Sequence, residues 1–170
     1  MTSTQTSRDA ALSAIVAATT AAVENDPDQA FAHFRATGSG GTAVRTDVRI
    51  GEHELLVDEP PALGGEDAAP NPVEFALAGL LSCQVVTYRF WAATLGIPLD
   101  DVDVRVEGDL DVRGFLGLDS AVRPGFTEVR VAVDLRGPAS DADYARLRET
   151  VDAHCPVLDL FRNATPVSTG

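Results

Sequence analysis

The two cysteines of this chain, Cys83 and Cys155, carry its most reactive side chains. Cys83 ends the stretch NPVEFALAGLLSC, and Cys155 lies in HCPVLDLF further along the chain. A thiol can attack an electrophile, be oxidised, or form a disulfide with a second thiol. A free cysteine is also among the most buried residue types and often packs as a small apolar side chain. The cysteines are therefore either inert core residues or one redox pair that the fold brings together.

Cys83 has no evident activating group in its sequence neighbourhood. It lies about three turns into a predicted helix that begins at Pro72, too far from the helix start for the dipole to act on it. A reactive thiolate needs a cation, a helix N-terminus or a hydrogen-bond donor beside it. The residues alone therefore favour a packing role for Cys83, and an arginine from elsewhere would have to activate it.

Cys155 lies between His154 and Pro156, where one predicted helix ends and a short one begins. Proline suits the first position of a helix, so Cys155 is expected to lie at its N-cap, where free N–H groups favour a thiolate. His154 is adjacent only in sequence, and neighbours on a helix point in different directions. Two cysteines and three histidines in no recognised ligand spacing predict neither a metal site nor a cofactor.

Glu74 and Arg45 are the charged candidates on either side of the long loop DEPPALGGEDAAPNP, residues 58–72. Glu74 precedes Cys83 on the same predicted helix by roughly 13 Å, on the opposite face, so no direct contact is expected. Glu74 is instead expected to cap the helix start or to bind an arginine. Arg45, in the stretch TAVRTDV, could be that arginine, although its residue context is also typical of a solvent-exposed strand.

Hydrophobic periodicity and turn residues predict an α+β domain. A GSGG hairpin loop at 38–41, a Gly51-Glu52 turn and an Asn71 N-cap separate the first elements. The central helix is apolar nearly all round and is expected to be buried on most sides. The predicted elements are a helix at 8–24, strands at 29–37, 42–50 and 53–58, a helix at 72–93, two antiparallel strands around 102–106 and 127–135, a helix from Ser140, a short helix from Pro156, and a final strand at 165–168.

Composition excludes several classes of function. The net charge is −13, and all 13 basic residues are arginine, which argues against binding to nucleic acid or to an anionic membrane. The most apolar segment is interrupted by Gln84 and Arg89, so no membrane span is predicted. The N-terminus lacks the apolar core of a signal peptide, and two cysteines make no disulfide framework. The expected location is the reducing cytoplasm.

The ordered set VDEPPALGGEDAAPNPVEFALAGLLSC, LGIPLDDVDVRVEGDLD and HCPV resembles the OsmC/Ohr family of thiol-dependent hydroperoxide reductases. The resemblance covers roughly residues 31–168 and divides the chain into an N-terminal helical extension, 1–28, and an OsmC-like domain, 29–170. It implies antiparallel sheets around a long buried central helix in an intertwined homodimer.

The resemblance also implies roles for the four candidate residues in an antioxidant stress response. Cys83 matches the peroxidatic cysteine, which becomes a sulfenic acid on attacking an organic hydroperoxide of the alkyl or fatty-acid kind. Cys155 matches the resolving cysteine, which then forms a disulfide with Cys83. A dithiol reductant, such as a lipoyl-bearing protein, would restore both thiols. An arginine of the early strands and a glutamate at the helix start would hold thiolate and peroxide, which implicates Arg45 and Glu74.

Two departures separate this chain from the peroxidase branch of the family. Val73 stands where that branch has a glutamate, so that Glu74 comes one residue later. Thr42 follows the paired glycines where that branch has an arginine, which leaves Arg45 as the first candidate and Arg35 as the second. The chain is therefore closer to the general OsmC-like branch. The alternatives are a non-catalytic OsmC-like binding protein with structural cysteines and, with less support, a thioesterase or acyltransferase that uses Cys83.

Overall fold

The computed structural model describes residues 3–170, which form two compact units. The larger unit comprises the chain up to Thr19 together with Gly79–Gly170, and the smaller unit comprises Thr20–Ala78. Two helices, α1 (Ser3–Asn25) and α2 (Pro72–Leu95), contribute residues to both units. Helices and antiparallel sheets together confirm the predicted α+β class, whereas the boundary at residue 28 and the homodimer remain predictions.

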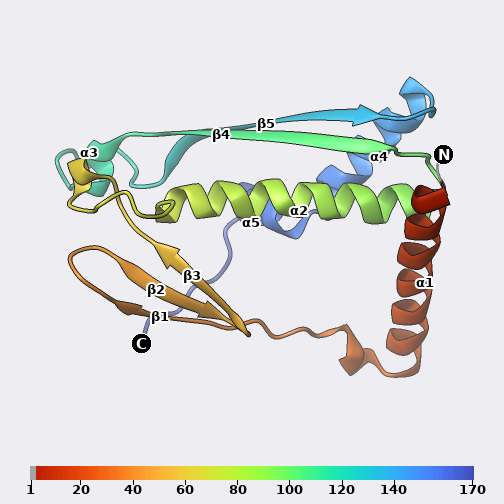
Figure 1. Cartoon of the computed structure of the whole chain (residues 1–170), viewed down its shortest axis with the longest axis horizontal. Coiled ribbons are helices and arrows are strands. Elements are labelled where there is room, and N and C mark those ends of the chain that lie inside the picture. Colours follow the sequence, from red (N-terminus) through yellow and green to blue (C-terminus); the bar gives the residue numbers. More distant parts are fainter. Residues whose placement is uncertain (1–2) are drawn as a thin grey trace. The chain divides into compact units, whose positions relative to one another are not determined.

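A long β-hairpin and the second half of α2 form the framework of the larger unit. The two strands pair antiparallel, and α2 runs along their hairpin (Figure 1). The predicted caps at Asn71 and Ser140 are confirmed: Asn71 Oδ1 accepts the N–H of Glu74, and the Ser140 hydroxyl accepts the N–H of Asp143 at 3.2 Å. The remaining elements of this unit are β4 (Asp101–Leu110), α3 (Val112–Phe115), β5 (Phe126–Arg136), α4 (Asp141–His154) and α5 (Pro156–Arg162).

One apolar cluster holds α2, the hairpin, α4 and α5 together. Inward-facing valines of β4 and β5 alternate with charged residues that face solvent, as expected for a sheet covered on one side. Cys155 belongs to the buried set, and Cys83 packs against it. The buried apolar residues are Leu80, Tyr88, Ala92, Ile97, Leu99, Val102, Leu147, Val151, Cys155 and Leu158.

The expectation that α2 is buried on most sides is wrong for the single chain. Its buried residues fall on one side of the helix and include Leu80, Gln84 and Tyr88. Val86, in the same stretch, is 53% exposed. One hairpin and two helices can cover only one side of a helix, so an apolar strip of α2 is left uncovered.

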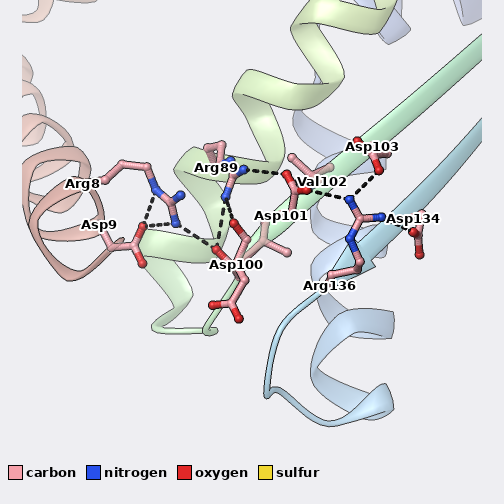
Figure 2. Close-up of polar contacts among 10 residues, drawn as sticks. Arg8, Asp9, Arg89, Asp100, Asp101, Val102, Asp103, Asp134 and Arg136 are labelled. Carbon is pink, nitrogen blue, oxygen red and sulfur yellow. Dashed lines mark hydrogen bonds and ion pairs between the residues drawn. The ribbon is translucent and has the colours of Figure 1, made fainter. Parts of the chain in front are cut away.

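The N-terminal helix and the start of β4 are joined by two arginines (Figure 2). The carbonyl of Leu99 accepts from Arg8 at 2.8 Å and from Arg89 at 3.2 Å. Arg89 also lies 3.4 Å from Asp101, which in turn binds Arg136 of β5 at 2.6 Å. Burial lowers the pKa of Arg89, and the nearby charge of Arg8 adds to this effect. The backbone carbonyl thus lies between two guanidinium groups and ties α1 to the hairpin.

The smaller unit contains a three-stranded antiparallel sheet in the order β1-β2-β3, formed by β1 (Ala36–Gly40), β2 (Thr46–Ile50) and β3 (His53–Val57). The turn at Gly51 is confirmed, but the first strand was predicted too early, at 29–37. Residues Pro27–Ala30 form a 3-10 turn instead. The GSGG segment lies largely within β1, because Gly38 and Gly40 pair with β2 and the chain turns only after Gly41.

A buried carboxylate organises the long loop that follows β3. The side chain of Asp58 accepts the N–H groups of Glu66 at 3.0 Å and Ala68 at 3.1 Å. The backbone N–H groups of Ala68, Glu59 and Glu66 lower the pKa of Asp58, and the charge of Arg45 lowers it further. The loop is therefore held by an ionised aspartate rather than by regular structure.

We expect Asp58→Asn to flatten the pH dependence of stability in the acidic range. The pKa of Asp58 is lower in the folded chain than its unfolded value of about 3.9, so its contribution is complete above that value and is lost as the pH falls through the folded pKa. Melting temperatures measured from pH 7 to pH 2 should fall less steeply for Asp58→Asn than for the parent. Asp67→Asn, an exposed change in the same loop, is the control, and parallel curves for parent and Asp58→Asn would contradict the assignment.

The C-terminal residues differ from the prediction. No strand forms at 165–168, and the described chain has no regular structure after α5 and the turn at Asn163. The short apolar run there finds no paired strand, and a strand needs a partner for its backbone groups. Among the described residues, no helix is both long and apolar enough for a membrane crossing.

Candidate active site

The structure brings Cys83 of α2 and Cys155 of the α4–α5 junction to the same apolar cluster. The Cys155 thiol acts on the pKa of Cys83, so the two side chains are neighbours, and both thiols are free. This arrangement follows from local signals: α2 presents Cys83 toward the core, while Pro156 ends α4 and places Cys155 at the turn.

The Cys83 thiol lies in a mixed environment of apolar atoms and hydrogen-bond donors. Burial raises its pKa above the usual value, the N–H of Val157 lowers it, and the Cys155 thiol raises it again. Thr87, one turn further along α2, has its hydroxyl oxygen 4.0 Å from the Cys83 sulfur. The balance is a raised pKa, so this unit holds Cys83 mainly as a thiol at neutral pH.

Val157, whose backbone N–H lowers the pKa of Cys83, was not predicted from the sequence as a site residue. It lies in the first turn of α5, where N–H groups have no partner within the helix. The sequence predicted that these N–H groups lie beside Cys155, but in the structure the Val157 N–H lowers the pKa of Cys83. The signal was present in Pro156, which marks the helix start, but the packing of α5 against α2 could not be derived from it.

Cys155 is the more buried of the two cysteines, with 2% of its surface exposed. It occupies the N-cap of α5 as predicted, but its side chain makes no capping hydrogen bond. Its backbone carbonyl accepts from Asp159 at 3.0 Å and starts the helix. The prediction that the Cys155 side chain caps α5 is therefore wrong, and Cys155 is a buried neighbour of Cys83.

The contacts of His154 do not indicate a catalytic Cys–His pair. Its Nδ1 lies 2.8 Å from the Thr150 carbonyl, and its ring contacts Trp91 with centroids 4.5 Å apart. These contacts are typical of a structural histidine at a helix end. No group of three or more potential metal ligands occurs within residues 3–170.

Glu74 belongs to the smaller unit and forms a reciprocal cap with Asn71. Asn71 Oδ1 accepts the N–H of Glu74 at 2.9 Å, and the Glu74 carboxylate accepts the N–H of Asn71 at 2.8 Å. This capping box explains why an acid at this position starts the helix at Pro72. The expectation that Glu74 caps the start of its helix is confirmed; a role in catalysis remains a prediction.

Arg45 also belongs to the smaller unit, in the turn between β1 and β2. Its guanidinium lies 3.2 Å from Asp47, and its charge acts on Asp58. Arg35, the second candidate, is exposed just before β1. The cysteines lie in one unit and both arginines in the other, so the choice between Arg45 and Arg35 stays a prediction.

Comparisons with known proteins agree with this fold. The sequence profile of the family described as OsmC-like protein matches residues 64–170. The chain therefore belongs to the OsmC-like family. No curated protein sequence matches the chain.

Solved structures from three organisms share the fold. An OsmC-like protein from Mycoplasma pneumoniae superposes with a TM-score of 0.68 at 15% identity, covering 78% of this chain and 89% of that one. An organic hydroperoxide resistance protein OsmC from Legionella pneumophila gives 0.61 at 24% identity, with 78% and 91% covered. An organic hydroperoxide resistance protein from Elizabethkingia anophelis gives 0.59 at 22% identity, with 78% and 90% covered.

Proposed function

We propose that this protein is a thiol-dependent peroxidase that reduces organic hydroperoxides. The observation that carries the proposal is that Cys83 packs against the buried cluster that contains Cys155, where the Cys155 thiol and the Val157 N–H both act on the pKa of Cys83. Two neighbouring thiols, one of which is affected by a backbone donor, suit a peroxidatic and resolving pair. The family and the relatives described as organic hydroperoxide resistance proteins support a peroxide-related role.

The proposed reaction has three balanced steps. The Cys83 thiolate attacks the terminal peroxide oxygen, the O–O bond breaks, and the alkoxide takes a proton and leaves as the alcohol, so that Cys83 becomes a sulfenic acid. Cys155 then attacks the Cys83 sulfur, the S–O bond breaks, and water leaves as the disulfide forms. A dithiol reductant finally exchanges with this disulfide, restoring both thiols and becoming oxidised itself.

The raised pKa of Cys83 means that the peroxidase needs a further group to favour the thiolate. We assign this role to Arg45, with Arg35 as the alternative, and we assign Glu74 to the orientation of that arginine and the peroxide. The proposal also includes the predicted homodimer, a lipoyl-bearing or similar dithiol partner and a cytoplasmic location.

The direct test is a comparison of substrates and reductants with the purified protein. We expect cumene hydroperoxide to be consumed faster than hydrogen peroxide, because apolar residues surround Cys83. Turnover should be supported by dihydrolipoamide better than by glutathione, since one dithiol can complete the exchange alone. Absence of turnover with every peroxide and reductant would refute the proposal.

A second candidate is a non-catalytic binding protein of the same family. The raised pKa of Cys83 favours this candidate, because a thiol that stays protonated at neutral pH is a weak nucleophile. Intact mass after treatment with one equivalent of hydroperoxide separates the two. A loss of two hydrogens indicates a disulfide, and an unchanged mass indicates packed, inert cysteines.

We expect Cys155→Ser to trap the first oxidised state. Without the resolving thiol, the Cys83 sulfenic acid has no partner in its own unit and should react with dimedone to give a stable adduct. The parent treated in the same way should give the disulfide and little adduct. The protein should remain folded, since serine differs from cysteine by one atom, and thermal melting checks this. A dimedone yield in Cys155→Ser no higher than in the parent would contradict the resolving role.

A further inference from the structure

A buried hydroxyl on α2 lies beside the sulfur of Cys83 and has no part in the reaction steps described above. Thr87 is 7% exposed and follows Cys83 by one helical turn. Its Oγ1 lies 2.7 Å from the Cys83 carbonyl oxygen and 4.0 Å from Cys83 Sγ. One hydroxyl group therefore faces two acceptors, a backbone oxygen and the sulfur that must ionise before it can attack a peroxide.

The hydrogen bond from the Thr87 hydroxyl to the Cys83 carbonyl is one that the helix does not require. Both residues lie well inside α2, where each carbonyl accepts the backbone N–H of the residue four positions later. Threonine hydroxyls in helices often add a second bond to that same carbonyl. If the Thr87 hydroxyl rotated away, the Cys83 carbonyl would keep its backbone partner and no buried backbone group would be left unpaired.

Ionisation of Cys83 reverses the order of the two acceptors. A neutral thiol is a weak acceptor, so the hydroxyl donates to the carbonyl while Cys83 keeps its proton. A thiolate is charged, and charge-assisted hydrogen bonds are shorter and roughly twice as strong as neutral ones. The contact of 4.0 Å between Oγ1 and Sγ is long, and we expect it to shorten when the sulfur becomes negative.

Thr87 is a different kind of donor from the other groups around Cys83. The N–H of Val157 is a fixed backbone group, and the Cys155 thiol, the titratable neighbour from the α4–α5 junction, raises the pKa of Cys83. Thr87 lowers that pKa and belongs to the same unit as Cys83, whereas Arg45 belongs to the smaller unit. The larger unit therefore contains a side-chain donor of its own for the sulfur.

We propose that Thr87 is the side-chain donor that stabilises the Cys83 thiolate, in addition to the arginine assigned above. The thiol proton leaves to the solvent, and the Thr87 hydroxyl turns from the Cys83 carbonyl to the sulfur while keeping its own proton. The ionised sulfur is then held in place for attack on the terminal peroxide oxygen. The role in peroxide reduction rests on the proposed function, whereas the hydrogen bond itself can be tested without a peroxide.

The test is the pH dependence of Cys83 alkylation by iodoacetamide in the full chain, with peptide mass distinguishing Cys83 from Cys155. Thr87→Val has nearly the same shape and lacks the hydroxyl. It should alkylate about tenfold more slowly at pH 7, with the midpoint of the profile moved to higher pH and the same rate once the thiol is fully ionised. Thr87→Ser keeps the hydroxyl and should follow the parent profile within about twofold.

Thr94→Val is the matched control on the same helix. The Thr94 hydroxyl also donates to the carbonyl four residues before it, that of Phe90 at 2.9 Å, but Thr94 is exposed and lies eleven residues beyond Cys83. Its replacement should leave the alkylation profile unchanged. Thermal melting checks the fold of each variant, and Thr87→Ala, which also lacks the hydroxyl, should repeat the shift seen with valine.

The outcomes separate this role from the proposed function. An alkylation midpoint that stays in place or moves to lower pH in Thr87→Val and Thr87→Ala would overturn the proposal, as would a Thr87→Ser profile that matches that of valine. Peroxidase assays on the same samples are scored separately. If the parent turned over no peroxide, the proposed function would fail, while the alkylation profiles would still decide whether Thr87 donates to the thiolate.

Discussion

Replacing Cys83 by serine is expected to lower the rate of organic hydroperoxide reduction by about three orders of magnitude or more. A serine hydroxyl stays protonated at neutral pH and cannot be oxidised to the equivalent of a sulfenic acid. Every later step of the proposed cycle depends on that sulfenic acid, so no slower route through Cys155 should replace it. The measurement is cumene hydroperoxide consumption with dihydrolipoamide as the reductant.

The control for this prediction is Cys155→Ser, which leaves Cys83 in place. That variant should still consume one equivalent of peroxide in a single turnover, whereas Cys83→Ser should consume none. Ser82→Ala, an exposed change on the preceding residue, should retain full activity. Undiminished turnover by Cys83→Ser would remove Cys83 from the mechanism and return it to a packing role.

Much of the fold could be predicted because the strongest signals are local. Asn71, Pro72 and Glu74 specify the start of α2 through a capping box, and Ser140 does the same for α4. Alternating valines predicted the β4–β5 hairpin, since the period of two has no helical explanation there. These elements depend on neighbouring residues and need no tertiary information.

The misplaced elements are those whose outcome depends on partners far along the chain. Gly38 and Gly40 have weak strand propensity, but pairing with Val48 and Thr46 of β2 places them in β1. Residues 165–168 have a suitable composition but no strand to pair with, and they stay irregular. Tertiary pairing overrides local preference in both cases, in opposite directions.

The candidate site was predictable only in part. The residues alone favoured an inert Cys83, and the pairing with Cys155 was implied by the family resemblance. The structure adds that the two thiols are neighbours and that the N–H of Val157 lowers the pKa of Cys83, and both depend on the packing of α5 against α2. A backbone donor carries no residue-type signal, so no reading of side chains could have identified it.

Replacing Gly65 by alanine is expected to destabilise the smaller unit by about 3 kcal/mol or more. A Cβ at this position would lie 1.8 Å from the Glu59 carbonyl oxygen and 2.7 Å from the Asp58 carboxylate. Neither group can move freely, because Asp58 holds the N–H groups of Glu66 and Ala68, and the Glu59 carbonyl accepts from Asp67 at 3.1 Å. The new methyl group must therefore break the loop that leads into α2.

Gly40→Ala separates this clash from a general effect of removing glycine. Gly40 lies in the same unit, at the end of β1, where a new methyl group would have no described atom within 4 Å and the backbone is not left-handed. Its replacement should change the free energy of unfolding by no more than about 0.5 kcal/mol in urea titrations. Because the loop arranges Asp58, Gly65→Ala should also flatten the acidic pH dependence of stability as Asp58→Asn does, and Gly40→Ala should not. Equal unfolding free energies for the two alanine variants would show that the loop yields to the methyl group without cost, and the close approach of Gly65 to Glu59 would then have no energetic role.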